Sequence, residues 1–185
     1  MRSTPLITGA LAVAATSALI GLGAAPGNAQ LPDAQTPDPM TPGVTHERGK
    51  LLECTGRAGT TPVRANIYQN QTYGNHLEVL VHDGTPDEAG VSREAATPFV
   101  VGHRVRATAR INGQKVTISG TAKPTGKVKR VHDVVEDAGL RIVSKGTHKI
   151  LQPVLTVSYD GRTGRLTCDN AFTFNLKVTK TSIGA

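Results

Sequence analysis

The dipeptide Asn112-Gly113 constrains the fold more than any other feature of the chain, because it lies between two runs of alternating apolar and polar residues. A type I′ turn needs positive φ at both central residues, and Asn and Gly adopt such values most readily. A two-residue loop also fixes the register, so Ile111 is expected to face Gln114 and Arg110 to face Lys115. The sequence therefore predicts an antiparallel hairpin over Phe99–Ala122.

The alternation divides this hairpin into an apolar face and a basic face. The residues expected on the apolar face are Val101, Val105, Ala107, Ala109, Ile111, Val116 and Ile118. His103 is expected on the same face, hydrogen-bonded at the edge of the core. Arg104, Arg106, Arg110 and Lys115 share the opposite face, and we interpret them as a candidate anion-binding surface. The alternative is that these charges only keep an exposed sheet from aggregating.

The rest of the chain predicts an all-β fold. Short alternating or β-branched runs recur from Lys50 to Thr179, among them 114–122, 127–135, 140–147 and 149–158. Turn signals such as Pro124–Gly126, Asp137–Gly139 and Asp160-Gly161 separate many of them. We expect about 8–9 strands and at most one short helical turn, at Pro86–Ala89. A single antiparallel β-sandwich is favoured, because large apolar residues are few. A closed up-and-down β-barrel is the alternative.

The first part of the chain has the features of an exported protein. Residues 1–29 are interpreted as a secretory signal peptide, with Arg2, an apolar run over Leu6–Leu22 and small residues before an expected cleavage after Ala29. Residues 30–47 are expected to form a disordered Pro-rich leader, and residues 48–182 a single all-β domain. No second hydrophobic segment follows, so we expect a secreted, extracellular protein with no membrane span after signal cleavage. The small-residue-rich signal is typical of bacterial export.

The chain contains two cysteines, Cys54 near the start of the predicted domain and Cys168 near its end. In an oxidising compartment such a pair most simply forms one disulfide. The sequence therefore predicts a bridge between the first and last strands.

The charge of the chain is uneven. Residues 30–100 contain 5 Lys or Arg against 9 Asp or Glu, whereas residues 101–185 contain 15 against 5. A strongly basic half favours association with anionic surfaces. The chain has no Trp, three Tyr and three Phe, so stacking recognition of single-stranded nucleic acid or of sugars is not expected, and no specific nucleic-acid partner is predicted.

No motif for catalysis or metal binding is present. The six histidines form no HxxxH or HExxH spacing, and no GxSxG occurs. Weaker alternatives are a metal site between His82 and His132, and calcium binding by the acidic clusters Asp83/Asp87/Glu88 and Asp133/Glu136/Asp137. We predict no catalytic residues, no metal and no cofactor.

Together these features predict a secreted, non-catalytic β-domain that recognises another macromolecule, either an anionic cell-envelope polymer or a protein. Protease inhibition by an exposed loop at Gly84–Thr97 is one version of the protein-binding hypothesis. The alternatives are a small-ligand-binding β-barrel carrier and a hydrolase with a non-local site. Small secreted bacterial β-sandwich proteins, including immunoglobulin-like ones, share the signal, the single disulfide and the short strands, but this analogy implies no function.

Overall fold

The computed structural model describes residues 41–82 and 89–183, and all regular structure in these residues is β-strand. The nine strands are β1 (Gly43–Ala58), β2 (Thr61–Asn70), β3 (Gly74–Val81), β4 (Ala89–Ala95), β5 (Val100–Val101), β6 (Arg104–Ile111), β7 (Gln114–Asp137), β8 (Leu140–Tyr159) and β9 (Arg162–Ser182). The helical turn predicted at Pro86–Ala89 lies mostly outside the described residues, and Ala89 itself begins β4.

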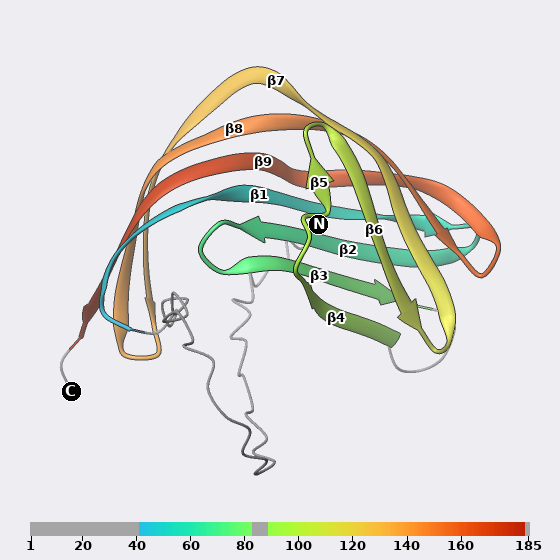
Figure 1. The fold of residues 1–185 in the computed structure, drawn as a ribbon, viewed down its shortest axis with the longest axis horizontal. Helices are drawn as coiled ribbons and strands as arrows, with labels where there is room; N and C mark the ends of the chain where they lie inside the picture. Colours follow the sequence, from blue (N-terminus) through green and yellow to red (C-terminus); the bar gives the residue numbers. More distant parts are fainter. Residues whose placement is uncertain (1–40, 83–88, 184–185) are drawn as a thin grey trace, which may run out of the picture. The chain divides into compact units, whose positions relative to one another are not determined.

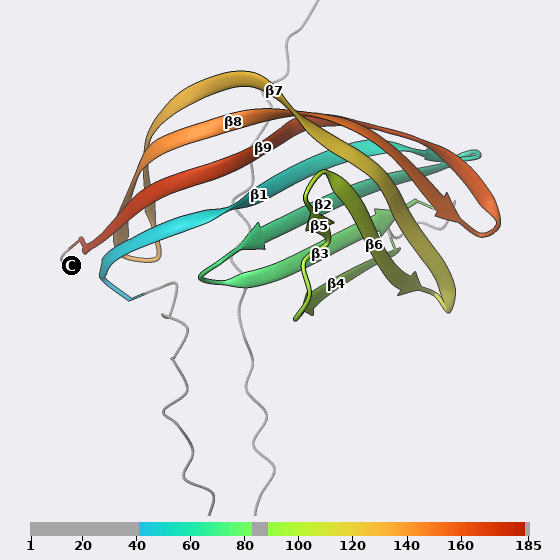
Figure 2. The same cartoon turned by 45° about the horizontal axis from the view of Figure 1, so that its top comes forward.

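The strands form one antiparallel sheet in the order β4-β3-β2-β1-β9-β8-β7-β6-β5. Strand β1 lies in the interior of the sheet and pairs with β2 on one side and with β9 on the other. Figures 1 and 2 show that the sheet curls into a half-barrel, in which β6 comes round in front of β2, β3 and β4. The all-β class predicted from the sequence is therefore confirmed.

Three two-residue turns with positive φ connect the long strands. Asn112 and Gly113 have φ values of 51° and 77°, and β6 and β7 pair in the register that the sequence predicts, with Arg110 opposite Lys115. Ala138-Gly139 joins β7 to β8, and Asp160-Gly161 joins β8 to β9, again with positive φ at both residues. These turns match the right-handed twist of the strands that they join.

The long strands differ from the sequence prediction. The runs expected at 114–122 and 127–135 belong to the single strand β7, and those at 140–147 and 149–158 belong to β8. Pro124–Gly126 lies at a register shift in β7 rather than in a connecting turn. Thr125 Oγ1 donates to the carbonyl of Ile150 at 3.0 Å and accepts from the N–H of Lys127 at 3.2 Å. A bulge tolerates a proline without interrupting the pairing of the rest of the strand.

Other differences concern shorter segments. β1 begins at Gly43 because its first residues pair with the end of β9, so residues 43–47 belong to the sheet and not to the predicted leader. Residues 89–95 of the predicted exposed loop form β4 on the edge of β3. The residues from Gly102 to His103 turn the chain between β5 and β6, so Val101 is 65% exposed and His103 is exposed. The prediction that these two side chains line the apolar face is wrong.

The main core fills the curled half of the sheet. Leu52, Ile67, Leu77, Val105 and Ile118 are among its fully buried side chains. Strand β5 pairs with β6 and is also fixed to β1 and β2 by side chains. Lys50 Nζ donates to the carbonyl of Val100 at 3.1 Å, and Gln69 Oε1 accepts from the Val100 N–H at 2.5 Å.

The remaining part of the sheet extends beyond this core, and we call it the arm (residues 43–50, 128–137, 140–150 and 172–182). A second set of buried side chains covers one face of the arm, including Phe174, Val178, Val131 and Leu140. The Phe174 ring stacks on Tyr68 with a centroid distance of 5.8 Å. Tyr68 pairs with Leu51, and the neighbouring pair, Leu52 with Ile67, points into the main core. Because successive side chains of a strand alternate between faces, Tyr68 and the second cluster lie on the face opposite the main core.

The disulfide predicted between Cys54 and Cys168 is present. The two cysteines are directly opposite each other in β1 and β9, next to a register shift between Glu53 and Cys54. The bridge therefore joins the first strand to the last across neighbouring positions of one sheet.

Candidate anion-binding surfaces

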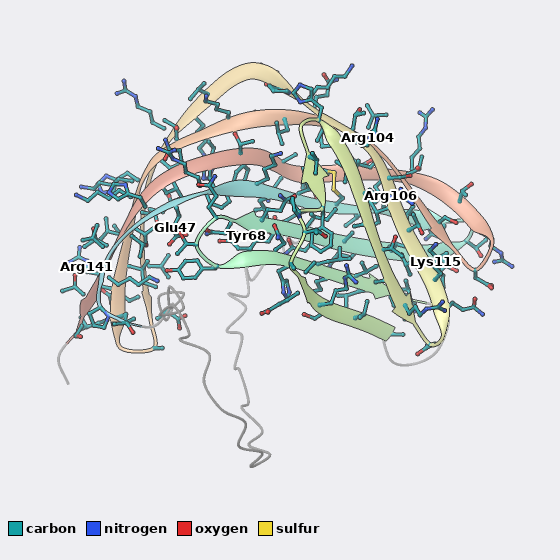
Figure 3. All side chains as sticks on the ribbon, in the orientation of Figure 1. Glu47, Tyr68, Arg104, Arg106, Lys115 and Arg141 are labelled. Carbon is teal, nitrogen blue, oxygen red and sulfur yellow. A yellow bond between two sulfur atoms is a disulfide. The ribbon has the colours of Figure 1, made fainter. Side chains whose placement is uncertain are left out.

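The four cations predicted to share the outer face of the β6–β7 hairpin are all exposed, and we call them the hairpin face (Arg104, Arg106, Arg110 and Lys115). The side chains of Arg106 and Arg110 point away from the core, because side chains alternate along β6 and those of Val105, Ala107 and Ala109 point into the core. Arg110 Nη1 donates to the Gly113 carbonyl at 3.1 Å, which holds the guanidinium close to the turn. Figure 3 shows Arg104, Arg106 and Lys115 toward the right of the view.

Hydroxyl groups and a further arginine extend the hairpin face across β8 and β9. Arg106 pairs with Ser119, Ser119 with Thr156, and Thr156 with Arg165, so one row crosses four strands. Ser119 Oγ and Thr156 Oγ1 are 3.3 Å apart in the middle of this row. No acidic residue occupies the row. Arginine and hydroxyl donors together suit oxyanions such as phosphate, sulfate or carboxylate.

A second basic surface, which the sequence analysis missed, lies on the arm. His46 pairs with Lys177, Lys177 with Lys145, and Lys145 with His132, so four basic side chains form one row across β1, β9, β8 and β7. All four are exposed. Residues directly opposite each other in an antiparallel pair have their side chains on the same face. The row therefore presents four adjacent basic groups to solvent.

Two further rows enlarge this surface. The next row is Arg48, Asn175, Thr147 and Arg130, and the one after it is Lys50, Thr173, Lys149 and Val128. Arg48 Nε donates to Asn175 Oδ1 at 3.3 Å. No acidic residue occupies any of the three rows. We call the six cations and two histidines of these rows the arm face (His46, Arg48, Lys50, Arg130, His132, Lys145, Lys149 and Lys177).

The hairpin face and the arm face lie on opposite sides of the sheet. The register shifts next to β8 place the extra residues in β7 and β9, so side chains alternate along β8 without interruption. Lys145 and Lys149 are in phase with the buried Leu151, Leu155 and Val157, and thus belong to the side of the main core. Thr156, which is in the row of Arg106, is on the other side.

An open groove borders the arm face where β5 crosses β1 and β2. Its lining includes Arg48, Lys50, Gln69, Phe174 and Thr173, together with Pro98 and the residues from Val100 to Gly102. Burial lowers the pKa of Lys50, whose ammonium donates to the carbonyls of Val100 and Gly102. Lys50 is therefore mainly committed to holding β5, whereas Arg48 faces the groove from the arm.

A polar cluster is enclosed on the opposite face of the arm. Glu47 is buried, and its carboxylate accepts from Thr45 Oγ1 at 3.1 Å and from Asn70 Nδ2 at 3.0 Å. Burial raises the pKa of Tyr68, and the charge of Glu47 adds to the effect. Figure 3 shows Glu47 and Tyr68 within the curve of the arm. Both oxygens of the carboxylate have donors, so this cluster fixes the β2–β3 turn rather than offering a free base.

One serine and one histidine that the sequence analysis did not single out are in contact. Ser92 Oγ on β4 and His76 Nε2 on β3 are 3.1 Å apart at an exposed position. A nucleophile and its base also need an acidic group to orient the base. Glu94 is opposite His76 in the register, but within the described ranges no ion pair between His76 and a carboxylate is present. Among the described residues, the pair is therefore not extended to a Ser-His-acid triad.

The metal alternatives gain no support. Within residues 41–82 and 89–183, no three His, Cys, Asp or Glu side chains could together hold a metal ion. His82 follows β3, whereas His132 is in the arm. Asp133 and Asp137 lie on one face of β7 and Glu136 on the other. Asp83, Asp87 and Glu88 lie outside the described residues.

Compared with protein-family models, with curated proteins and with solved structures, the chain has no significant match. The part of the chain that the structure describes contains no helix of the length and hydrophobicity needed to span a lipid bilayer. A disulfide is compatible with an extracellular protein.

Proposed function

We propose that this protein is a secreted, non-catalytic β-domain that recognises an anionic polymer of the bacterial cell envelope through the hairpin face. The observation that carries the proposal is the row from Arg106 through Ser119 and Thr156 to Arg165, in which Ser119 is half-buried and the other three residues are exposed, and which contains oxyanion donors and no acidic residue. Secretion is part of the proposal, supported by the signal-like start of the chain and by the disulfide.

The cross-strand pair Arg110–Lys115 also supports a binding role. Like charges directly opposite each other destabilise a strand pair. A bound anion would reduce the repulsion between Arg110 and Lys115 more than water does. The hairpin face carries no aromatic residue, which favours recognition of charged groups along a polymer over stacking on sugars or bases.

A sandwich-like body suits this function better than a hollow barrel. Side chains of β2 and β3 and of β6 and β7 together fill the space within the curl, including Ile67, Leu77, Ala107 and Ile118. A filled interior favours surface recognition over the alternative function of a small-ligand carrier, which would need an apolar cavity.

The test is retention on a polyphosphate column under a salt gradient. The hairpin variant (Arg106→Ala with Arg110→Ala) should elute at lower salt than the wild type, because phosphate contacts determine the salt dependence of binding. A control variant (Arg64→Ala with Lys129→Ala) removes the same charge from exposed positions outside both basic faces and should elute with the wild type. Equal elution of the hairpin variant and the wild type would contradict the proposal.

A further inference from the structure

We propose that the arm face is a second binding site for the same class of polymer, a linear chain of phosphate groups without aromatic bases, and that the protein therefore bridges two polymer segments. The inference builds on the proposed function of the hairpin face, but the arm face stands on its own residues. Its core is the row His46, Lys177, Lys145 and His132, in which each basic side chain is directly opposite the next.

The arrangement of this row points to a ligand rather than to solvation alone. Lys145 and Lys177 are directly opposite each other and are flanked on both sides by histidines. Neither of the two neighbouring rows contains an acid. The nearest acid on the same face is Glu136, two rows further along, where it is directly opposite Arg141. Each buried side chain of the arm is on the other face, so packing does not require Lys145 and Lys177.

The dimensions of the arm face suit an extended polymer. Four strands at about 4.8 Å spacing make each row about 14 Å long, and successive rows are about 6.7 Å apart. The open groove beside Arg48 continues the surface toward β5. Phe174 also lines this groove. The side chains of Phe172 and Phe174 are nevertheless out of phase with the three rows, so the rows themselves offer charge without a stacking platform.

The central rows of the two faces are too far apart to act as one site, although Lys50 at the edge of the arm face contacts the Gly102 carbonyl, two residues before Arg104 of the hairpin face. Thr156, in the row of Arg106, and Lys145 are both in β8 and are eleven positions apart, which corresponds to about 36 Å along an extended strand. This separation is several Debye lengths at physiological salt, where the Debye length is about 8 Å. Since the faces also lie on opposite sides of the sheet, one short chain cannot occupy both. A long polymer, or two separate polymers, can.

Two polyphosphate probes separate one site from two. With a chain too short to reach from one face to the other, titration calorimetry should give two equivalents per wild-type molecule. It should give one equivalent for the hairpin variant and one for the arm variant (Lys145→Ala with Lys177→Ala). With long-chain polyphosphate, the wild type and the control variant should cross-link the polymer and scatter light strongly, and scattering should disappear again in excess polymer. Both single-face variants should bind the long chain without cross-linking it.

The outcomes separate the two proposals. An arm variant that still binds two short chains and cross-links like the wild type would overturn the bridging inference and leave the hairpin face intact. A hairpin variant that behaves like the wild type, together with an arm variant that binds nothing, would overturn the proposed function instead. Far-ultraviolet circular dichroism and the urea midpoint of each variant verify that the sheet is folded.

Discussion

Ala138 is the one residue other than Gly, Asn or Asp that the described part of the chain holds at positive φ, with a value of 45°. The β7–β8 turn imposes this conformation, since a two-residue hairpin loop of this type needs it at both positions. An alanine there costs about 1 kcal/mol because its Cβ approaches the following carbonyl.

Replacing Ala138 with Gly should therefore raise the free energy of unfolding by roughly 0.5–1 kcal/mol. Urea denaturation followed by circular dichroism measures the change. Ala96→Gly is the matched control, because Ala96 is exposed but is not at positive φ. It should leave stability unchanged or lower it. A stability for Ala138→Gly below that of the wild type would contradict the strain at this turn.

His148 introduces a pH dependence of stability. Its ring stacks on Phe172 with a centroid distance of 3.8 Å, and burial lowers the pKa of His148 below the ordinary value of 6.5. Asp133 opposes this effect, whereas Lys129 reinforces it. The unfolded chain then binds more protons than the folded chain in this range, so stability falls as the pH drops through about 6.5.

The urea midpoint of the wild type should therefore decrease between pH 7.5 and pH 5.5 by more than that of His148→Gln. His132→Gln removes a histidine from the exposed opposite face of the arm and should keep the wild-type pH dependence. If all three proteins lose stability in parallel over this range, His148 is not the responsible group.

At the scale of the elements, cross-strand pairs set a balance between stability and binding. Arg110 and Lys115 are directly opposite each other beside the Asn112-Gly113 turn. Replacing Lys115 with Glu turns a repulsive pair into an attractive one, which should stabilise the hairpin by about 0.5 kcal/mol.

The same change should lower the retention of the protein on a polyphosphate column, because it removes a positive charge from the hairpin face. Thermal unfolding together with column retention tests both effects, and Lys115→Gln should give intermediate values for both. A Lys115→Glu protein that is less stable than the wild type would contradict this balance.

The elements differ in how far the sequence predicts them. The β6–β7 hairpin follows from its turn and alternation, because both signals are local and give the same register. The sequence predicts a loop where β4 lies, because Gly90, Ser92, Arg93 and Glu94 have little β-propensity. Pairing with β3 makes this segment a strand.

The two basic surfaces also differ in how far the sequence predicts them. The hairpin face was predictable because its four cations lie within twelve residues of one hairpin. The arm face was not, because its first row takes one residue from each of four strands, and His46 and Lys177 are brought together only by the pairing of β1 with β9. The local signals for it are the alternations His46-x-Arg48-x-Lys50 and Lys145-x-Thr147-x-Lys149, each within a single strand.

At the scale of the whole molecule, the disulfide joins the first strand of the described sheet to the last, and these two strands are neighbours in the interior of the sheet. Cys54 and Cys168 are 114 residues apart in sequence. On the chain-entropy model, a cross-link closing a loop of this length stabilises the folded state by about 4–5 kcal/mol.

Reduction should lower the free energy of unfolding by up to this amount, and the urea midpoint with and without a thiol reductant measures it. The double variant Cys54→Ala with Cys168→Ala should match the reduced wild type and should not respond to the reductant. A reductant that shifts the double variant as much as the wild type would show that the effect has another origin.

The position of β1 between β2 and β9 has a consequence for shorter versions of the chain. Strands β1 to β4 and strands β5 to β8 each pair with their sequence neighbours, and the 21-residue strand β9 is the one whose backbone pairs with both sets, through β1 and β8. A protein that stops before Arg162 would therefore not be a smaller copy of this molecule. It would contain two incomplete sheets in one chain, without the strand that pairs with both β1 and β8.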